Sequence, residues 1–123
     1  MYQRAFGQLR GNRYKRAIKS FRAFLKKHPK GALSDNAQYW LAEALLVSRK
    51  YKSAITEFNK LIKNFPKSPK VVSSKVKVGY AYYELRQTKK ARRILRAVIK
   101  NYPNSSPAAL AKMHLKRMKR RRK

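Results

Sequence analysis

Residues 14–29, YKRAIKSFRAFLKKHP, are followed by a close copy, YKSAITEFNKLIKNFP, at residues 51–66. The two copies lie 37 residues apart and share their apolar positions, and the same step continues into the last third of the chain. Its five columns are Ala17, Ala54 and Ala91; Pro29, Pro66 and Pro103; Leu25, Ile62 and Ile99; Phe21, Phe58 and Leu95; and Ala5, Ala42 and Gly79. A fixed period of this length is typical of proteins in which similar units stack on one another.

Apolar residues within each copy follow the period of a helix. In the first copy they are Tyr14, Ala17, Ile18, Phe21, Phe24 and Leu25. These positions form one stripe along an α-helix. The prolines then end the helices, because a residue that precedes proline avoids the helical region. We expect helices near residues 2–10, 14–28, 34–48, 51–64, 70–86, 88–101 and 107–119.

The expected helices form pairs, with one helix left over. Small residues recur at positions 5, 42 and 79 and at 17, 54 and 91, where they let paired helices approach closely. The predicted fold class is therefore all-α, a superhelix of three helical hairpins plus a C-terminal capping helix. We place the repeats at about residues 1–35, 36–72 and 73–106, the capping helix at 107–119 and a basic tail at 120–123.

This frame resembles the tetratricopeptide repeat (TPR), whose usual unit of about 34 residues is lengthened here. The segments DNAQYWLAEALL, FPKSPKV, GYAYYELRQTKKAR and YPNSSPAALAK together resemble the C-terminal TPR domain of the YbgF/CpoB family. Members of that family are periplasmic, Tol–Pal-associated coordinators of cell division. The resemblance implies a protein-interaction scaffold, the Tol machinery as partner and the periplasm as location.

Three features depart from that family. The chain opens with MYQRAFGQLR, which has no apolar signal-peptide core, and no trimerising coiled coil precedes the repeats. The helix exteriors, which mix both charges in the family, are almost entirely basic. We therefore expect a recombinant TPR domain with an engineered, supercharged surface, monomeric without the coiled coil. A natural basic paralogue is the alternative.

Charge is the extreme feature of the composition, with 34 Lys and Arg against four Asp and Glu and a net charge of +30. Such a surface attracts polyanions, such as nucleic acid or acidic proteins, through release of counterions. No base-reading motif is present, so binding to nucleic acid should be non-specific. The ordinary alternative for a charge run is a solvated face. The expected polyanion-binding residues are Lys15, Arg16, Lys19, Arg22, Lys89, Lys90, Arg92, Arg93, Arg96, Arg120, Arg121 and Arg122.

The resemblance also implies a concave groove lined by the first helix of each hairpin. The expected peptide-binding residues there are Tyr2, Phe6, Asn36, Tyr39, Glu43, Tyr80, Tyr83 and Glu84, beside Leu9, Leu46 and Val76. Tyrosines would supply rigid amphipathic contacts, and the two carboxylates would orient a polar or basic segment. Trp40 and Tyr82 should pack inward. The alternative is a shallow cleft with ordinary surface tyrosines.

The other two acids have structural interpretations. Asp35 stands where a carboxylate can cap a helix N-terminus and meet the positive end of its dipole. Glu57 can form an ion pair with Lys60 three residues later.

Nothing in the sequence favours catalysis. There is no cysteine, and the two histidines, His28 and His114, are far apart. We expect no metal, no cofactor and no enzymatic activity, because no carboxylate pair, phosphate loop or ligand cluster is present. No apolar run approaches the roughly 20 residues that cross a bilayer. Two function classes remain: a TPR interaction scaffold, or a cationic protein that binds polyanions through its convex face.

Overall fold

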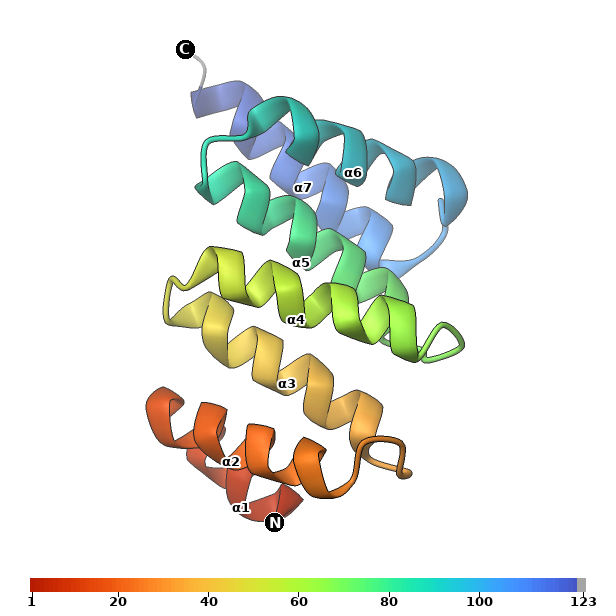
Figure 1. Ribbon diagram of the computed structural model, residues 1–123. Coiled ribbons are helices and arrows are strands. Elements are labelled where there is room, and N and C mark those ends of the chain that lie inside the picture. Colours follow the sequence, from red (N-terminus) through yellow and green to blue (C-terminus); the bar gives the residue numbers. More distant parts are fainter. Residues whose placement is uncertain (122–123) are drawn as a thin grey trace.

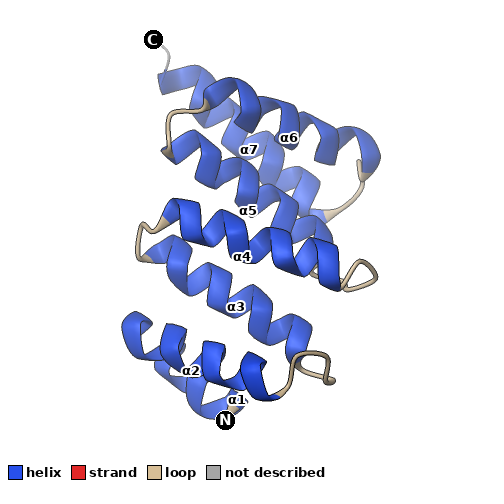
Figure 2. Cartoon of the chain, viewed as in Figure 1, coloured by secondary structure: helices blue, strands red, loops and turns tan. Residues whose placement is uncertain are grey.

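The computed structural model describes residues 1–121, and every regular element in that range is a helix. The helices are α1 (Tyr2–Arg10), α2 (Tyr14–Lys27), α3 (Ser34–Val47), α4 (Tyr51–Asn64), α5 (Val71–Glu84), α6 (Thr88–Asn101) and α7 (Ser106–Arg121). They are stacked from the N-terminus to the C-terminus in Figure 1, and Figure 2 shows the short loops that join them. The predicted all-α superhelix of three hairpins and a final helix is confirmed.

The helix ends differ slightly from the prediction. Helix α5 is shorter than expected at both ends, whereas α7 begins one residue early and continues to Arg121. Arg120 and Arg121, which we expected in a basic tail, are thus helical. In the described part of the chain, no helix has the length and apolar character needed to span a bilayer.

Small residues allow the paired helices to pack closely, as the sequence predicted. Ala5, Ala17 and Ala42 are completely buried, and Gly79 of α5 stands in the column of Ala5 and Ala42. A Cβ atom added at Gly79 would lie 2.8 Å from Leu95 Cδ2, closer than such atoms can approach. Helices α5 and α6 therefore meet at a distance that only glycine permits without a shift of Leu95.

The turn inside each hairpin uses the same unusual backbone conformation. Asn12, Arg49 and Arg86 lie one repeat apart and have φ angles of 61°, 62° and 65°. Asparagine adopts this left-handed region more readily than arginine does. Each turn donates two backbone N–H groups to the preceding helix, as from Arg49 to Leu46 and from Lys50 to Leu45.

The loops between hairpins are held by side chains at the start of α3. The Ser34 hydroxyl accepts a hydrogen bond from the Gly31 N–H at 2.7 Å and donates one to the His28 carbonyl. Asp35 accepts hydrogen bonds from the Asn36 N–H at 2.9 Å and from the Ser68 hydroxyl at 2.6 Å. Asp35 is therefore not the cap that we predicted, because the N-cap of α3 is Leu33 and has no side-chain cap. Its carboxylate instead accepts the Asn36 N–H within the first turn, and its second oxygen fixes the α4–α5 loop.

Helices α1 and α3 touch, and α5 packs against α7. We call the side of the molecule formed by α1, α3, α5 and α7 the inner face, and the side formed by α2, α4 and α6 the outer face. In Figure 1, α1 lies behind α2, and α7 lies behind α5 and α6.

Candidate functional site

The inner face is hollowed where α3, α5 and α7 meet. A cleft of about 430 Å³ lies among residues that include Glu43, Lys77, Tyr80, His114 and Arg117. A smaller hollow of about 70 Å³ shares three of these residues and extends to α7's last turn. We call these two hollows the groove, lined by Glu43, Arg49, Lys77, Tyr80, Tyr83, Glu84, His114, Arg117 and Arg121.

Both acids of the groove are already paired with cations. Lys77 Nζ lies 3.1 Å from Glu43 Oε1, and Arg121 Nη1 lies 3.9 Å from Glu84 Oε1. Glu43 Oε1 is shielded from solvent and accepts no well-directed hydrogen bond, so the ammonium group of Lys77 is what balances its charge. The Glu43 carboxylate is therefore not free to select a basic ligand, and the Glu84 carboxylate already has a cation at the limit of ion-pair distance.

The remaining charges of the groove are positive. Arg49 and Arg117 line the larger hollow, and neither forms an ion pair with a described residue. Arg117 lies beside Tyr80, which offers an aromatic surface and a hydroxyl group. A guanidinium group binds carboxylates with two parallel hydrogen bonds. The groove is thus suited to an extended segment that carries carboxylates.

The two rings at the centre of the groove are held in their neutral forms. His114 packs against Tyr80, with ring centroids 5.0 Å apart. Burial lowers the pKa of His114, and the nearby Arg117 and Lys77 lower it further. Burial raises the pKa of Tyr80, with Glu84 adding to the effect. A neutral imidazole has one donor and one acceptor, so His114 can hydrogen-bond to a peptide backbone.

Four of the eight predicted peptide-binding residues line these hollows, namely Glu43, Tyr80, Tyr83 and Glu84. Leu46, which was expected beside them, also lines the larger hollow. On α1, Tyr2 packs edge-on against Phe21 and Phe24. Phe6 packs against Trp40, which is half-buried and packs against the core as we expected. These rings form an aromatic cluster at the N-terminal end of the molecule.

Three other predicted groove residues have different surroundings. The Tyr39 side chain is 7% exposed and packs edge-on against Phe58, and burial raises its pKa to about 12. Val76 is completely buried in the core, so its predicted groove position was wrong. Asn36 is half-buried, and its backbone N–H is donated to Asp35.

The prediction missed the contribution of α7, although the repeat frame extends into it. One repeat after Lys77 stands His114, one repeat after Tyr80 stands Arg117, and one repeat after Glu84 stands Arg121. Each of these α7 residues lines the groove. Carrying the 37-residue columns past residue 106 would have found all three, because α7 occupies the place of a fourth first helix.

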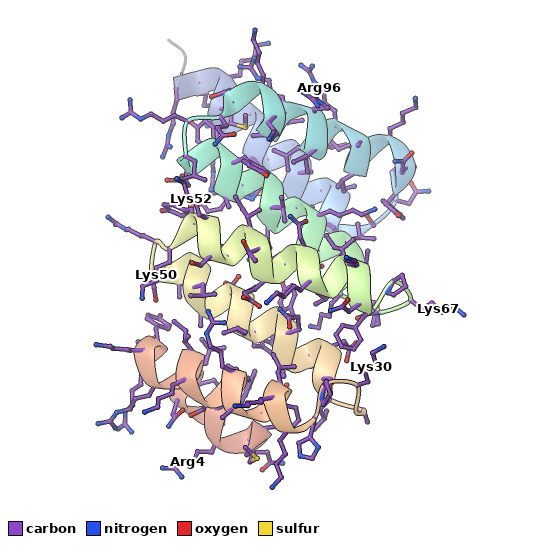
Figure 3. All side chains as sticks on the ribbon, in the orientation of Figure 1. Arg4, Lys30, Lys50, Lys52, Lys67 and Arg96 are labelled. Carbon is purple, nitrogen blue, oxygen red and sulfur yellow. The ribbon has the colours of Figure 1, made fainter. Side chains whose placement is uncertain are left out.

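The outer face carries many of the predicted cations. Lys15, Arg16, Lys19, Lys89, Lys90, Arg93 and Arg96 are exposed, and Arg92 is half-buried. In Figure 3, labelled side chains such as Lys52, Lys67 and Arg96 project away from the ribbon. Lys90 also lies over the Tyr82 ring, 4.8 Å from its centroid.

The tail cations need a correction. Arg121 lies 3.4 Å from the Tyr83 hydroxyl and pairs with Glu84, so it belongs to the groove and not to a separate basic tail. Arg120 is exposed on α7, and Arg122 lies outside the described residues.

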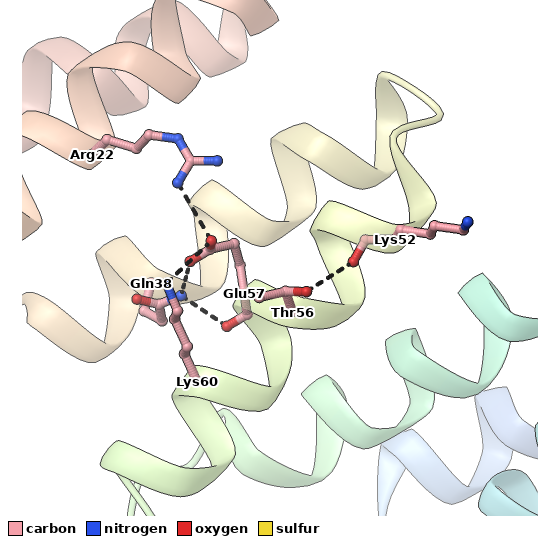
Figure 4. Close-up of polar contacts among 6 residues, drawn as sticks. All are labelled: Arg22, Gln38, Lys52, Thr56, Glu57 and Lys60. Atoms are coloured by element: carbon pink, nitrogen blue, oxygen red, sulfur yellow. Dashed lines mark hydrogen bonds and ion pairs between the residues drawn. The ribbon is translucent and has the colours of Figure 1, made fainter.

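A polar network around the buried Glu57 carboxylate joins α2, α3 and α4. The Glu57 side chain is 7% exposed and receives ion pairs from Arg22 at 3.3 Å and Lys60 at 3.5 Å. The Gln38 amide donates to the Glu57 carboxylate at 2.9 Å and to its backbone carbonyl at 2.8 Å. Figure 4 shows Arg22, Gln38 and Lys60 converging on this carboxylate. The predicted Glu57–Lys60 pair is confirmed, and Arg22 is partly occupied by the same acid.

Within residues 1–121, no three His, Asp or Glu side chains come together in a way that could hold a metal ion.

The stacked hairpins and the lined inner face define a helical-repeat protein of the interaction-scaffold class. Family models described as tetratricopeptide repeat match residues 2–69 and 74–105, so the chain belongs to the tetratricopeptide-repeat family. The fold of this family typically serves as a non-enzymatic scaffold.

Solved structures agree with this assignment at the level of fold. The second TPR domain of human RPAP3, solved by NMR in complex with the HSP70 peptide SGPTIEEVD, has a TM-score of 0.75 and 20% identity. The match covers 93% of this chain and 90% of that one. MamA 41-end from Desulfovibrio magneticus RS-1 has a TM-score of 0.70 and 19% identity, and the match covers 94% of this chain and 70% of that one. No curated protein sequence matches the chain significantly.

Proposed function

We propose that this protein is a non-enzymatic TPR scaffold whose groove binds an acidic, extended segment of a partner protein. The observation that carries the proposal is the charge balance of the groove. Glu43 and Glu84 are each paired with a cation, whereas Arg49 and Arg117 have no acidic partner among the described residues. From the sequence we expected a polar or basic ligand, whereas this charge balance favours an acidic one.

The chemistry of a known TPR ligand supports this choice. The peptide in the RPAP3 complex, SGPTIEEVD, ends in two glutamates, a valine and an aspartate. A segment of this kind offers several carboxylates to Arg117 and Arg49, and an apolar side chain to Tyr80 and Leu110, which line the same hollow. We infer that the partner of this chain has a similar acidic end or loop.

Peptide binding to single variants tests the proposal. Fluorescence anisotropy would follow labelled SGPTIEEVD and a version with its acids replaced by Gln and Asn. Because a charged hydrogen bond contributes about 1.5–3 kcal/mol, Arg117→Ser should weaken binding of the acidic peptide about tenfold or more. The matched control is Arg16→Ser, which removes the same charge from an exposed position on α2 of the outer face. Equal losses in both variants, or equal affinity for the neutral peptide, would contradict a shaped groove.

The net charge of +30 supports a second candidate function, non-specific binding of polyanions by the outer face. Affinity for a short DNA duplex should fall steeply with salt, ignore base sequence and be abolished by polyglutamate. A triple variant in which Arg92, Arg93 and Arg96 are each replaced by Glu should weaken this binding and leave the groove peptide bound. Binding that persists at high salt would argue against a purely electrostatic surface.

The YbgF/CpoB resemblance adds a biological setting to the proposal. We infer a periplasmic, Tol-associated role for the parent domain, an engineered cationic surface, and a monomer in this form. The Tol-associated role would be tested by pull-down of purified Tol components with this chain and with a variant whose helix exteriors carry both acidic and basic residues, as in the family. Failure of both versions would contradict it. Sedimentation at low salt would measure the oligomeric state and so test the expected monomer.

A further inference from the structure

The buried network around Glu57 has a counterpart one repeat later, and the counterpart is an open cleft. At the 37-residue step, the residues Arg22, Gln38, Glu57 and Lys60 correspond to Asn59, Lys75, Ile94 and Ala97. All four of these counterparts line a cleft of about 350 Å³ between α4, α5 and α6. In the first interface, shown in Figure 4, polar side chains converge and join the helices. In the second, the equivalent positions leave a hollow on the outer face.

The interior of this outer cleft is apolar. Val78 and Val98, which are 5% and 2% exposed, line it together with the half-buried Ile62, Ile94 and Tyr102. The first two belong to the hydrophobic core, so the cleft is shaped by packed helices and not by mobile loops. Ala97 is exposed beside it, where its small side chain leaves the hollow open. A volume of roughly 300–1,000 Å³ is typical of ligand sites.

The surroundings of the outer cleft are cationic. Lys75 lines it, with Nζ lying 5.6 Å from the centroid of the Tyr102 ring. Exposed cations stand next to its lining residues in sequence, namely Lys63 after Ile62, Arg93 before Ile94 and Arg96 before Ala97. Among the described residues, no acid lines the cleft. An occupant must therefore combine an apolar group with negative charge, and a second copy of this chain, at +30, would be repelled.

We propose that the outer cleft anchors one large apolar side chain of an acidic protein segment. The apolar side chain enters between Ile62 and Ile94 and is covered by Tyr102, while carboxylates of the segment meet Lys75 and the flanking arginines. Large side chains seated in such pockets contribute most of the affinity of protein interfaces. The site lies on the other face from the groove, so it does not depend on the function proposed for the groove.

A substitution at Ala97 can separate two contributions to peptide binding, because added positive charge favours an acidic peptide whereas a blocked cleft excludes its tryptophan. Two labelled peptides would be compared by anisotropy: a short run of glutamates with one central tryptophan, and the same run with serine in its place. Ala97→Lys adds a positive charge, and its long side chain should cover the cleft from the position that corresponds to Lys60, which pairs with Glu57 in the first interface. The matched control is Ala23→Lys, which adds the same charge at the exposed equivalent position of α2. Helicity of both variants would be checked by circular dichroism.

We expect the tryptophan peptide to bind the unmodified protein about tenfold or more tightly than the serine peptide, as burial of a large apolar side chain predicts. Ala97→Lys should erase this preference, and Ala23→Lys should retain it. Equal affinity for both peptides would overturn the proposal. It would also be overturned if the preference survived in Ala97→Lys, because the tryptophan would then bind elsewhere.

Discussion

The side-chain amide of Gln38 in α3 donates a hydrogen bond to the buried carboxylate of Glu57 in α4, at 2.9 Å. Together with Arg22 from α2, this contact joins the first two hairpins through one acid. Since the protein has only four acids, one quarter of its negative charge serves this interface.

Loss of the Glu57 carboxylate should therefore destabilise the fold. Glu57→Ala leaves the Gln38 amide without its side-chain acceptor and removes the counter-ion of Arg22 and Lys60. We expect the free energy of unfolding to fall by about 2–3 kcal/mol, in the range for a broken buried network. Urea denaturation would measure it. Glu57→Gln keeps an acceptor for Gln38 and should cost less, and equal losses would show that the acceptor is unimportant.

The contact between Gly79 and Leu95 predicts that Gly79→Ala has opposite effects on stability in the native protein and in Leu95→Ala. Gly79→Ala brings a Cβ atom to 2.8 Å from Leu95 Cδ2, and such overpacking costs about 1–3 kcal/mol, against a helix-propensity gain of about 1 kcal/mol. We expect a net loss of stability in the native background. In Leu95→Ala the clash is absent, so Gly79→Ala should stabilise the protein. Chemical denaturation of the four proteins in this cycle measures the coupling, and strict additivity would contradict it.

The left-handed turns predict a stabilising substitution. Arg49 and Arg86 adopt φ angles of 62° and 65°, in the position where the first repeat has Asn12. Because the left-handed region costs a non-glycine residue about 1–2 kcal/mol and asparagine less, Arg86→Asn should raise the free energy of unfolding by about 0.5–1 kcal/mol. The reverse substitution, Asn12→Arg, should lower it. Thermal melts at high salt would separate this effect from the loss of charge.

Burial of His114 predicts a loss of stability in mild acid. Its pKa is lower in the folded protein than its ordinary value of 6.5. As the pH falls below about 6.5, the unfolded chain binds the proton more readily, so the folded state loses stability. The histidine faces Lys77, Arg117, Tyr80 and Glu43 in the groove.

To test this, the free energy of unfolding would be measured at pH 7.5 and at pH 5 for each variant. The loss between the two pH values is then compared with that of the native protein. His114→Gln should show a smaller loss than the native protein, because it removes the titrating group. His28→Gln, which replaces an exposed histidine in the same way, serves as the control. A pH response of His114→Gln identical to that of the native protein would contradict the effect of burial.

Self-repulsion should make the stability depend on salt. Like charges face each other one turn apart along the outer helices, as at Lys15 and Lys19 or at Lys89 and Arg93, and each such pair costs roughly 0.2–0.5 kcal/mol. Screening by salt weakens this repulsion, so the melting temperature should rise as NaCl is added. An unchanged melting temperature across the salt series would contradict the repulsion, and sucrose at equal osmolarity provides a control.

The sequence by itself determined the helices and their pairing. Local apolar periodicity places each helix, prolines end the second helix of each hairpin, and the small residues at Ala17, Ala54 and Gly79 show where helices meet closely. These properties depend on neighbours within a few turns, or on a repeat that the chain shows directly. The all-α superhelix and most helix ends could therefore be predicted without tertiary information.

The candidate site depends on which side chains meet across hairpins, and only the tertiary structure decided that. Tyr39 and Val76 share the face expected to line the groove, yet neighbouring helices bury them. Glu43 and Glu84 look like free carboxylates in the sequence, but Lys77 and Arg121 neutralise them from helices that follow later in the chain. Packing also decided that Ala97 lies beside an open cleft, whereas Lys60 at the equivalent position pairs with Glu57, because a cleft depends on how the side chains of three separate helices meet.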